Sequence, residues 1–265
     1  MMKFLVQQQP ACVYTGGKPF DAAKPTVVFV HGAANDHSVW TYQARYFAHH
    51  GWNAMAIDLP GHGKSFGAAK PAIAASADWI VNLLDHGGVS QAALVGHSMG
   101  SLIALDCAVR HGARVSHLAL LGTSSPMPVS DALVNAAQHR PADAFDMLNI
   151  WGHAPQLKWG RNPTPGTSSM MAYKRLLENS QPGVLATDLA ACQAYQIDDE
   201  ALAGFKLPTL IMAGTRDMMT PPKSAEALAA RINGCRVEML DEVGHAMMQE
   251  APGKSLDILK AFLNP

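Results

Sequence analysis

The chain has 265 residues, of which 48% are hydrophobic and 15% are charged, and its formal net charge is −1. A chain of this length and apolar content can bury a large core as one domain. The balanced charge, without any run of Lys or Arg, excludes a nucleic-acid-binding footprint and a polybasic membrane patch. The expected partner is therefore a small molecule.

Cysteine usage and the N-terminus point to the compartment. The four cysteines are Cys12, Cys107, Cys192 and Cys235. They lack any paired spacing, which is typical of reduced thiols rather than of a disulfide framework. The apolar run at residues 4–6 is too short for a signal-peptide core or a membrane span. We expect a cytoplasmic protein without a membrane segment.

The first half of the chain alternates short apolar runs with segments of helical spacing. Strands are predicted at 3–8 and 11–15, separated by Pro10, and then at 27–30, 52–57, 92–95 and 118–121, with helices at 38–49, 73–85 and 99–111. The alternation favours a mostly parallel, eight-stranded-type sheet covered by helices on both faces. In such a fold, ligands bind beyond the carboxyl ends of the strands.

The alternation stops after the strand at 118–121 and resumes near residue 207. The interval is far longer than an ordinary connection of ~4–6 residues. It has helical spacing at 131–138, 142–150, 168–178 and 184–194. We predict a helical cap at 123–206, inserted into a core made of 1–122 and 207–265. The core then continues with strands at 208–213 and 236–240 and helices at 221–232 and 252–263.

The pentapeptide GHSMG at residues 96–100 joins a predicted strand to a predicted helix. So abrupt a change of direction imposes strained backbone angles on Ser98, and the flanking glycines leave room for close approach. The following helix directs its free N–H groups and partial positive charge at whatever lies over the hydroxyl. This context favours a nucleophile over a serine that only caps the helix.

A serine nucleophile needs a base to take its proton and an acid to orient that base. Asp217 and His245 each follow a predicted strand at the ligand-binding edge. The segment 123–125, which follows the predicted strand at 118–121, offers no carboxylate that could orient the base instead. Asp241 and Glu242 are also close to His245 in sequence, but we interpret them as solvent-exposed charges at a strand end.

These motifs, in this order, resemble the α/β-hydrolase fold family with a helical cap. The residues that carry the resemblance are HG at 31–32, DLPGHGKS at 58–65, GHSMG at 96–100, GTRD at 214–217 and GH at 244–245. The resemblance implies that Ser98 is the nucleophile, His245 the base and Asp217 the orienting acid. It also implies an oxyanion hole formed by the backbone N–H groups of Ala33 and Met99.

The remaining histidines are interpreted as structural. His31 is expected to brace the oxyanion loop, His97 to pack beneath the turn that carries Ser98, and His62 to stabilise its own turn. No cluster has metal-ligand spacing, so we predict no metal and no cofactor.

The resemblance implies a serine-dependent, carboxylesterase-like hydrolase that acts on a small carboxylic ester or related acyl compound through an acyl-enzyme. Epoxide and haloalkane hydrolases of this fold need aspartate at the position of Ser98. A carbon-carbon bond hydrolase, a perhydrolase and a small-molecule receptor with a retained triad stay open as alternatives. Trp151, Trp159 and Met218 are candidate substrate contacts, although aromatic and methionine side chains of a cap also serve as its core. The natural substrate and the oligomeric state are left open by the sequence.

Overall fold

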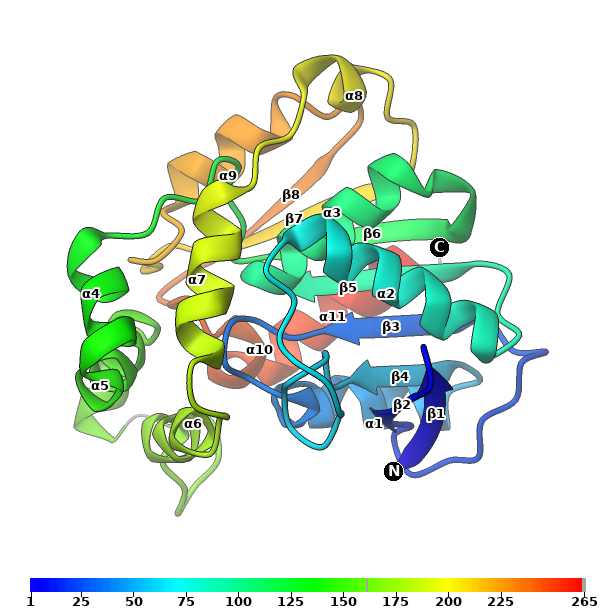
Figure 1. Cartoon of the computed structure of the whole chain (residues 1–265). Helices are drawn as coiled ribbons and strands as arrows, with labels where there is room; N and C mark the ends of the chain where they lie inside the picture. The colour runs from blue at the N-terminus through cyan, green and yellow to red at the C-terminus, as the bar shows by residue number, and fades with distance from the viewer. Residues whose placement is uncertain (161, 264–265) are drawn as a thin grey trace.

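The computed structural model describes residues 1–160 and 162–263. They build an eight-stranded sheet in the order β1-β2-β4-β3-β5-β6-β7-β8 (Figure 1). The strands are β1 Met2–Val6, β2 Gln9–Tyr14, β3 Thr26–Val30, β4 Asn53–Ile57, β5 Ala92–His97, β6 Val115–Leu121, β7 Thr209–Gly214 and β8 Arg236–Leu240. All neighbours from β4 to β8 pair in parallel, which confirms the predicted sheet.

The first two strands form the predicted antiparallel pair, but its boundary was wrong at Pro10. This residue lies inside β2, opposite Leu5 of β1, rather than between the strands. β2 pairs with β4 only at Val13 and Tyr14, so the first residues of β2 lie beside no strand on that side. Proline is tolerated there because an edge position does not require its missing N–H.

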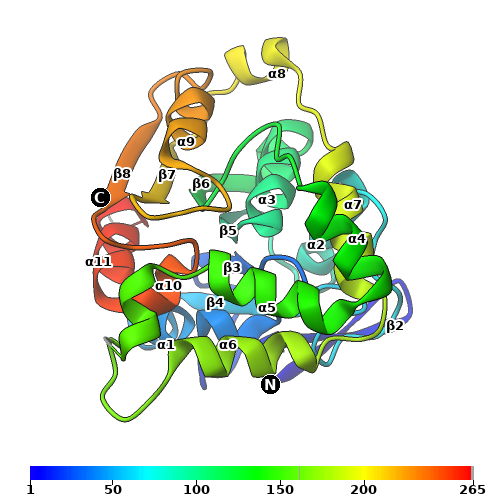
Figure 2. The ribbon, with the colours of Figure 1, turned by 90° about the vertical axis from the view of Figure 1, so that its left-hand side faces the viewer.

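Helices cover both faces of the sheet (Figures 1 and 2). Helices α2 (Ile73–His86), α3 (Met99–Arg110) and α9 (Pro222–Ala229) pack on one face, and α1 (Thr41–His49) and α11 (Pro252–Leu263) on the other. The apolar runs of β3, β4, β5 and β7 are buried throughout, as expected of strands covered on both sides.

Two predicted helices differ at their ends. The segment 38–49 divides into a 3-10 turn, η1 (His37–Trp40), followed by α1. Helix α9 ends at Ala229 instead of Ile232, because Arg231 and Ile232 donate to the carbonyl three residues back, which tightens the last turn. Helix α10 (Met247–Glu250) is a further short element before α11.

The segment between β6 and β7, residues 122–208, is called the helical insertion below. It contains α4 (Asp131–His139), α5 (Pro141–Trp151), η3 (Pro155–Trp159), α6 (Ser169–Glu178), α7 (Val184–Ala194) and α8 (Asp199–Ala203). Helices α4 to α7 lie beyond the arrowheads of the parallel strands, across the carboxyl edge of the sheet (Figures 1 and 2). The insertion has its own apolar cluster, which includes Leu148, Tyr173 and Leu177. Its separation into a cap domain bounded at 123 and 206 stays a prediction.

Among the described residues, none of the helices combines the length and apolar character needed to cross a bilayer.

Candidate active site

Ser98 occupies the junction between β5 and α3 and has the strained backbone that its position predicts. Its φ is 53° and its ψ is −121°, a conformation that non-glycine residues rarely adopt. The Ser98 amide donates to the Leu121 carbonyl of β6 at 2.9 Å, and the Ser98 carbonyl accepts from Ser101 at 2.8 Å. These backbone bonds hold the turn, so the side chain projects from the edge of the sheet.

The two glycines that flank this turn allow the helix to approach the sheet. A Cβ on Gly96 would lie 2.1 Å from the Gly100 carbonyl oxygen, and a Cβ on Gly100 would lie 2.3 Å from the Val30 carbonyl oxygen of β3. Neither backbone oxygen can move without displacing α3 from the sheet. The glycines of the GHSMG motif are thus required by close packing beneath the serine.

His245 and Asp217 meet beside this turn, although 28 residues separate them. The Nδ1 atom of His245 donates to Asp217 Oδ2 at 2.8 Å. Both side chains are buried, with His245 4% and Asp217 4% exposed. Because Nδ1 carries the proton in this contact, Nε2 of the neutral ring is the free acceptor.

The Asp217 carboxylate is held ionised by its donors. Oδ1 accepts from the amides of Met219 and Thr220 at 2.8 Å each, and Oδ2 also accepts from the Thr220 hydroxyl at 2.8 Å. Burial by itself would raise the pKa of Asp217, but His245 and the hydrogen bonds from Thr220 lower this pKa below its ordinary value. Thr220 was missed by the sequence analysis, because a hydroxyl three residues after an aspartate is a common local pattern.

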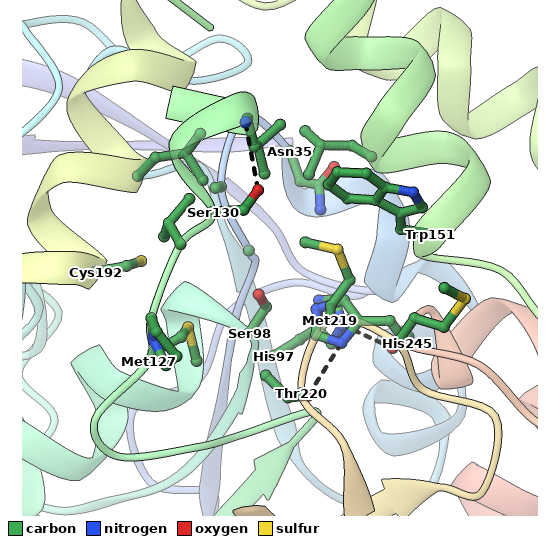
Figure 3. A pocket seen from close by; sticks show the side chains of 18 of the residues that line it. Asn35, His97, Ser98, Met127, Ser130, Trp151, Cys192, Met219, Thr220 and His245 are labelled. Atoms are coloured by element: carbon green, nitrogen blue, oxygen red, sulfur yellow. Dashed lines mark hydrogen bonds between the residues drawn. The ribbon is translucent and has the colours of Figure 1, made fainter. Parts of the chain in front are cut away.

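Ser98 and His245 face the same pocket, a cavity of about 180 Å³. Figure 3 shows the Ser98 hydroxyl directed into it, with His245 and Trp151 on one side and Met127 and Cys192 on the other. The insertion supplies much of the remaining wall, so the pocket lies between the sheet edge and the insertion.

The structure separates the three predicted substrate contacts. Trp151, at the end of α5, and Met218, beside Asp217, both line the pocket. Trp159 is absent from its lining, and the residue is 85% exposed. Its placement at the pocket is corrected for a physical reason: η3 is a short 3-10 turn whose buried residue is Leu157, which leaves the tryptophan at the end of the turn on the surface.

His97 has a structural contact with the loop that carries His245. Its Nε2 donates to the backbone carbonyl of His245 at 2.9 Å, and the two rings lie 4.7 Å apart. Burial, followed by the charge of the neighbouring His245, lowers the pKa of His97 to about 3. Gly122 completes this packing, since a Cβ there would lie 2.9 Å from two atoms of the His245 ring. A glycine after a strand gives no such signal in the sequence.

His31 orients the peptide that precedes Ala33. Its Nδ1 donates to the Gly32 carbonyl at 2.8 Å, and the Asn35 amide donates to the same oxygen at 3.2 Å. In a trans peptide the N–H points opposite to the C=O, so these contacts direct the Ala33 N–H away from His31. Ala33 lines the pocket. Met99 is the first residue of α3, where an N–H has no intrahelical acceptor.

The two competing carboxylates lie on the surface. Glu242 accepts from Arg216 at 2.7 Å, and both side chains are more than half exposed. Asp241 accepts from the Thr215 hydroxyl at 3.3 Å in an exposed contact. The position of each agrees with its interpretation as a solvent-exposed strand-end charge.

Within the described residues, the group that could supply three ligands to a metal ion is Asp36, His37 and Asp58. Each of these three side chains already has a hydrogen bond within the protein. Asp58 Oδ1 accepts from the amide and from Nδ1 of His37, Asp58 Oδ2 accepts from the Lys64 amide, and Asp36 Oδ1 accepts from the Ser38 amide. These contacts make the cluster a brace for its loop.

Comparison with known proteins places the chain in a family. Residues 25–252 match the model of the alpha/beta hydrolase fold. The chain belongs to the α/β-hydrolase fold family. This membership confirms the predicted fold and the predicted class, a hydrolytic enzyme.

Relatives of this α/β hydrolase include ester and lactone hydrolases. The chain is 29% identical over 244 residues to a pimeloyl-[acyl-carrier protein] methyl ester esterase of Neisseria meningitidis serogroup B, with 85% of this chain and 87% of that protein covered. It is 25% identical over 242 residues to 3-oxoadipate enol-lactonase 1 of Acinetobacter baylyi, with 90% of this chain and 88% of that protein covered. An esterase from Exiguobacterium antarcticum has the same fold, with a TM-score of 0.85, 22% identity and 99% of each chain covered.

Proposed function

We propose that this α/β hydrolase cleaves small, neutral carboxylic esters through an acyl-enzyme on Ser98. The observation that carries the proposal is the buried His245–Asp217 contact of 2.8 Å, which directs Nε2 of the same imidazole toward the pocket that Ser98 faces. Covalent labelling by a fluorophosphonate, together with release of p-nitrophenol from a short-chain ester, is the direct test. Binding of an ester without turnover would instead support a receptor. The cytoplasmic location stays a prediction.

The proposed reaction has two halves, and in each of them His245 acts first as a base and then as an acid. The Ser98 Oγ attacks the ester carbonyl carbon while its proton moves to His245 Nε2. The N–H groups of Ala33 and Met99 stabilise the negative charge on the carbonyl oxygen. The intermediate collapses, and His245 returns the proton to the departing alcohol. Water then attacks the acyl-enzyme with His245 as base, which releases the carboxylic acid and restores Ser98.

The pocket supports a small and neutral acyl group. Apart from the two histidines, the described residues that line it carry no ionisable acid or base other than Tyr173 and Cys192. Burial raises the pKa of both the tyrosine and the cysteine, so both side chains are uncharged near neutrality. A cavity of ~150 Å³ accommodates a benzene molecule, so the observed 180 Å³ suits a short acyl chain or a single ring. A charged acyl group would lose its hydration here without gaining a counterion.

We therefore expect kcat/KM to favour p-nitrophenyl butyrate over p-nitrophenyl octanoate and over the p-nitrophenyl monoester of succinic acid. The four-carbon neutral chain and the succinyl chain have similar sizes, so that pair isolates the effect of charge. Equal rates for the pair would contradict the neutral-substrate assignment, and equal rates for butyrate and octanoate would contradict the size assignment.

Replacing Trp151 by alanine should change the chain-length preference. The substitution removes a large side chain from the pocket wall, so we expect the ratio of octanoate to butyrate kcat/KM to rise about tenfold, a change of ~1.4 kcal/mol. Trp159→Ala is the matched control, because that side chain is exposed and outside the pocket, and its ratio should stay within about twofold of the parent. An equal octanoate-to-butyrate ratio in the two variants would contradict the assignment of Trp151 to the acyl site.

Activity should fall in acid because a protonated His245 cannot accept the Ser98 proton. The pKa of Asp217 lies below its ordinary value and that of His97 is about 3, so neither of these groups changes charge between pH 8 and pH 5. We expect kcat/KM to decrease as the pH is lowered from 8 to 5. A flat profile to pH 5 would contradict the role of His245 as base.

A further inference from the structure

Asp188 is a buried carboxylate on the helical insertion that the proposed reaction does not use. It lies in α7, whose sequence VLATDLAACQA is otherwise without charge, and its side chain is 2% exposed. Neighbouring residues of the same helix, Leu189 and Cys192, line the substrate pocket. The carboxylate itself points to two groups of the core, so α7 both walls the pocket and contacts the sheet edge.

Both contacts involve the same carboxylate oxygen. Asp188 Oδ2 accepts from the Ala34 amide at 2.8 Å and from His62 Nε2 at 2.8 Å. His62 Nδ1 lies 3.0 Å from the Pro60 carbonyl oxygen. Because both partners of the ring can only accept, both ring nitrogens carry protons, and His62 is an imidazolium paired with Asp188.

The protonated state of His62 agrees with its surroundings. Burial would lower the pKa of His62, but the hydrogen bond and charge of Asp188 raise it above its ordinary value. The neighbouring ring of His31, at 4.9 Å, is neutral, because burial and the charge of His62 lower its pKa to about 4. A buried ion pair contributes little net stability compared with apolar packing, so stability alone does not account for the pair, and we look for another role.

The contact with Ala34 supplies that role. Ala34 has a φ of 54°, a left-handed conformation that is costly for a residue with a Cβ. The hydrogen bond from the Ala34 N–H to Asp188 holds that conformation on one side of Ala33. On the other side, the hydrogen bond from His31 holds the Gly32 carbonyl. Ala33 lies between the two anchors, so the direction of its N–H is fixed at both ends.

We propose that Asp188 is a positioning residue for the oxyanion hole. It fixes the direction of the Ala33 N–H through Ala34, and it thereby couples the geometry of the hole to the packing of the insertion against the core. This inference rests on the proposed function, since it requires Ala33 to stabilise the reacting carbonyl oxygen. An oxyanion donor acts on the transition state more than on the bound ester, so the expected signature is a loss of kcat with little change in KM.

The test compares Asp188→Asn with Asp146→Asn. Asp146 is a half-exposed partner of Lys174 elsewhere in the insertion, so its variant controls for loss of one carboxylate there. We expect Asp188→Asn to lower kcat for p-nitrophenyl butyrate ~10²-fold with KM within about threefold, as for other losses of an oxyanion donor. Phosphonylation of Ser98 by a fluorophosphonate should slow similarly, because the phosphoryl oxygen occupies the same hole. Asp146→Asn should leave both rates within about twofold.

Asp188→Glu is the second variant, because it retains the charge for His62 but displaces the carboxylate from the Ala34 amide. It should retain the thermal midpoint better than Asp188→Asn and still lose kcat. Folded variants with parental kcat, or with a raised KM and an unchanged kcat, would overturn the proposal. So would failure of both variants to fold, since Asp188 would then be required for the fold itself. If the unaltered protein fails to label with the fluorophosphonate, the proposed function fails instead.

Discussion

Ser98→Ala is expected to abolish ester turnover, with a fall in kcat of ~10⁶-fold, as for other hydrolases that lose the nucleophile of a serine-histidine pair. Alanine removes only the hydroxyl, and the backbone bonds of the turn to Leu121 and Ser101 remain. The variant should therefore keep the parental circular dichroism spectrum and bind ester without cleaving it. Initial rates with p-nitrophenyl butyrate at high enzyme concentration measure the residual activity.

The matched control is Ser125→Ala. Among the residues that the structure describes, the buried Ser125 hydroxyl has no hydrogen-bond partner, and Ser125 lies outside the substrate pocket. The same chemical change there should therefore leave turnover within about twofold of the parent. Turnover by Ser98→Ala within a few-fold of the parent would remove this residue as the nucleophile and, with it, the acyl-enzyme mechanism.

Asp217→Asn is expected to lower kcat by ~10⁴-fold, the loss typical when the acid of such a triad becomes an amide. An asparagine amide facing His245 Nδ1 would favour the tautomer with its proton on Nε2, and that ring cannot accept the serine proton. The amide would also leave an imidazolium without its counterion during the reaction. A pH series of kcat/KM separates this effect from misfolding, since activity should recover partly where hydroxide assists deprotonation.

Asp241→Asn tests whether the acid has been assigned to the right carboxylate. Asp241 lies close to His245 in sequence, but its contact with Thr215 is exposed. We expect its variant to keep kcat within about twofold of the parent. A large loss of kcat in Asp241→Asn, together with a small loss in Asp217→Asn, would assign the acid to Asp241. It would also contradict the interpretation of the buried 2.8 Å contact between His245 and Asp217.

The sequence by itself determined the class of the fold and the residue types of the proposed chemistry. The alternation of buried runs with helical periodicity predicts a covered parallel sheet, because each element must bury its apolar face against another layer. The GHSMG motif likewise predicts a strained serine. Its glycines, Gly96 and Gly100, are needed because another backbone segment lies where a Cβ would be at each position. Each of these constraints selects particular residue types at particular positions of the chain, so it can be recognised in the sequence before the partner segment is known.

Only the tertiary structure decided what lies around those residues. Trp151 and Trp159 are equivalent in composition, yet one lines the pocket and the other is exposed, because the packing of α5 and η3 sets their directions. Asp188 accepts a hydrogen bond from the Ala34 amide, although 154 residues separate the two in sequence. No local sequence pattern predicts so distant a partner. Contacts of this kind form only when the layers pack together, so their geometry depends on the whole chain rather than on any segment of it.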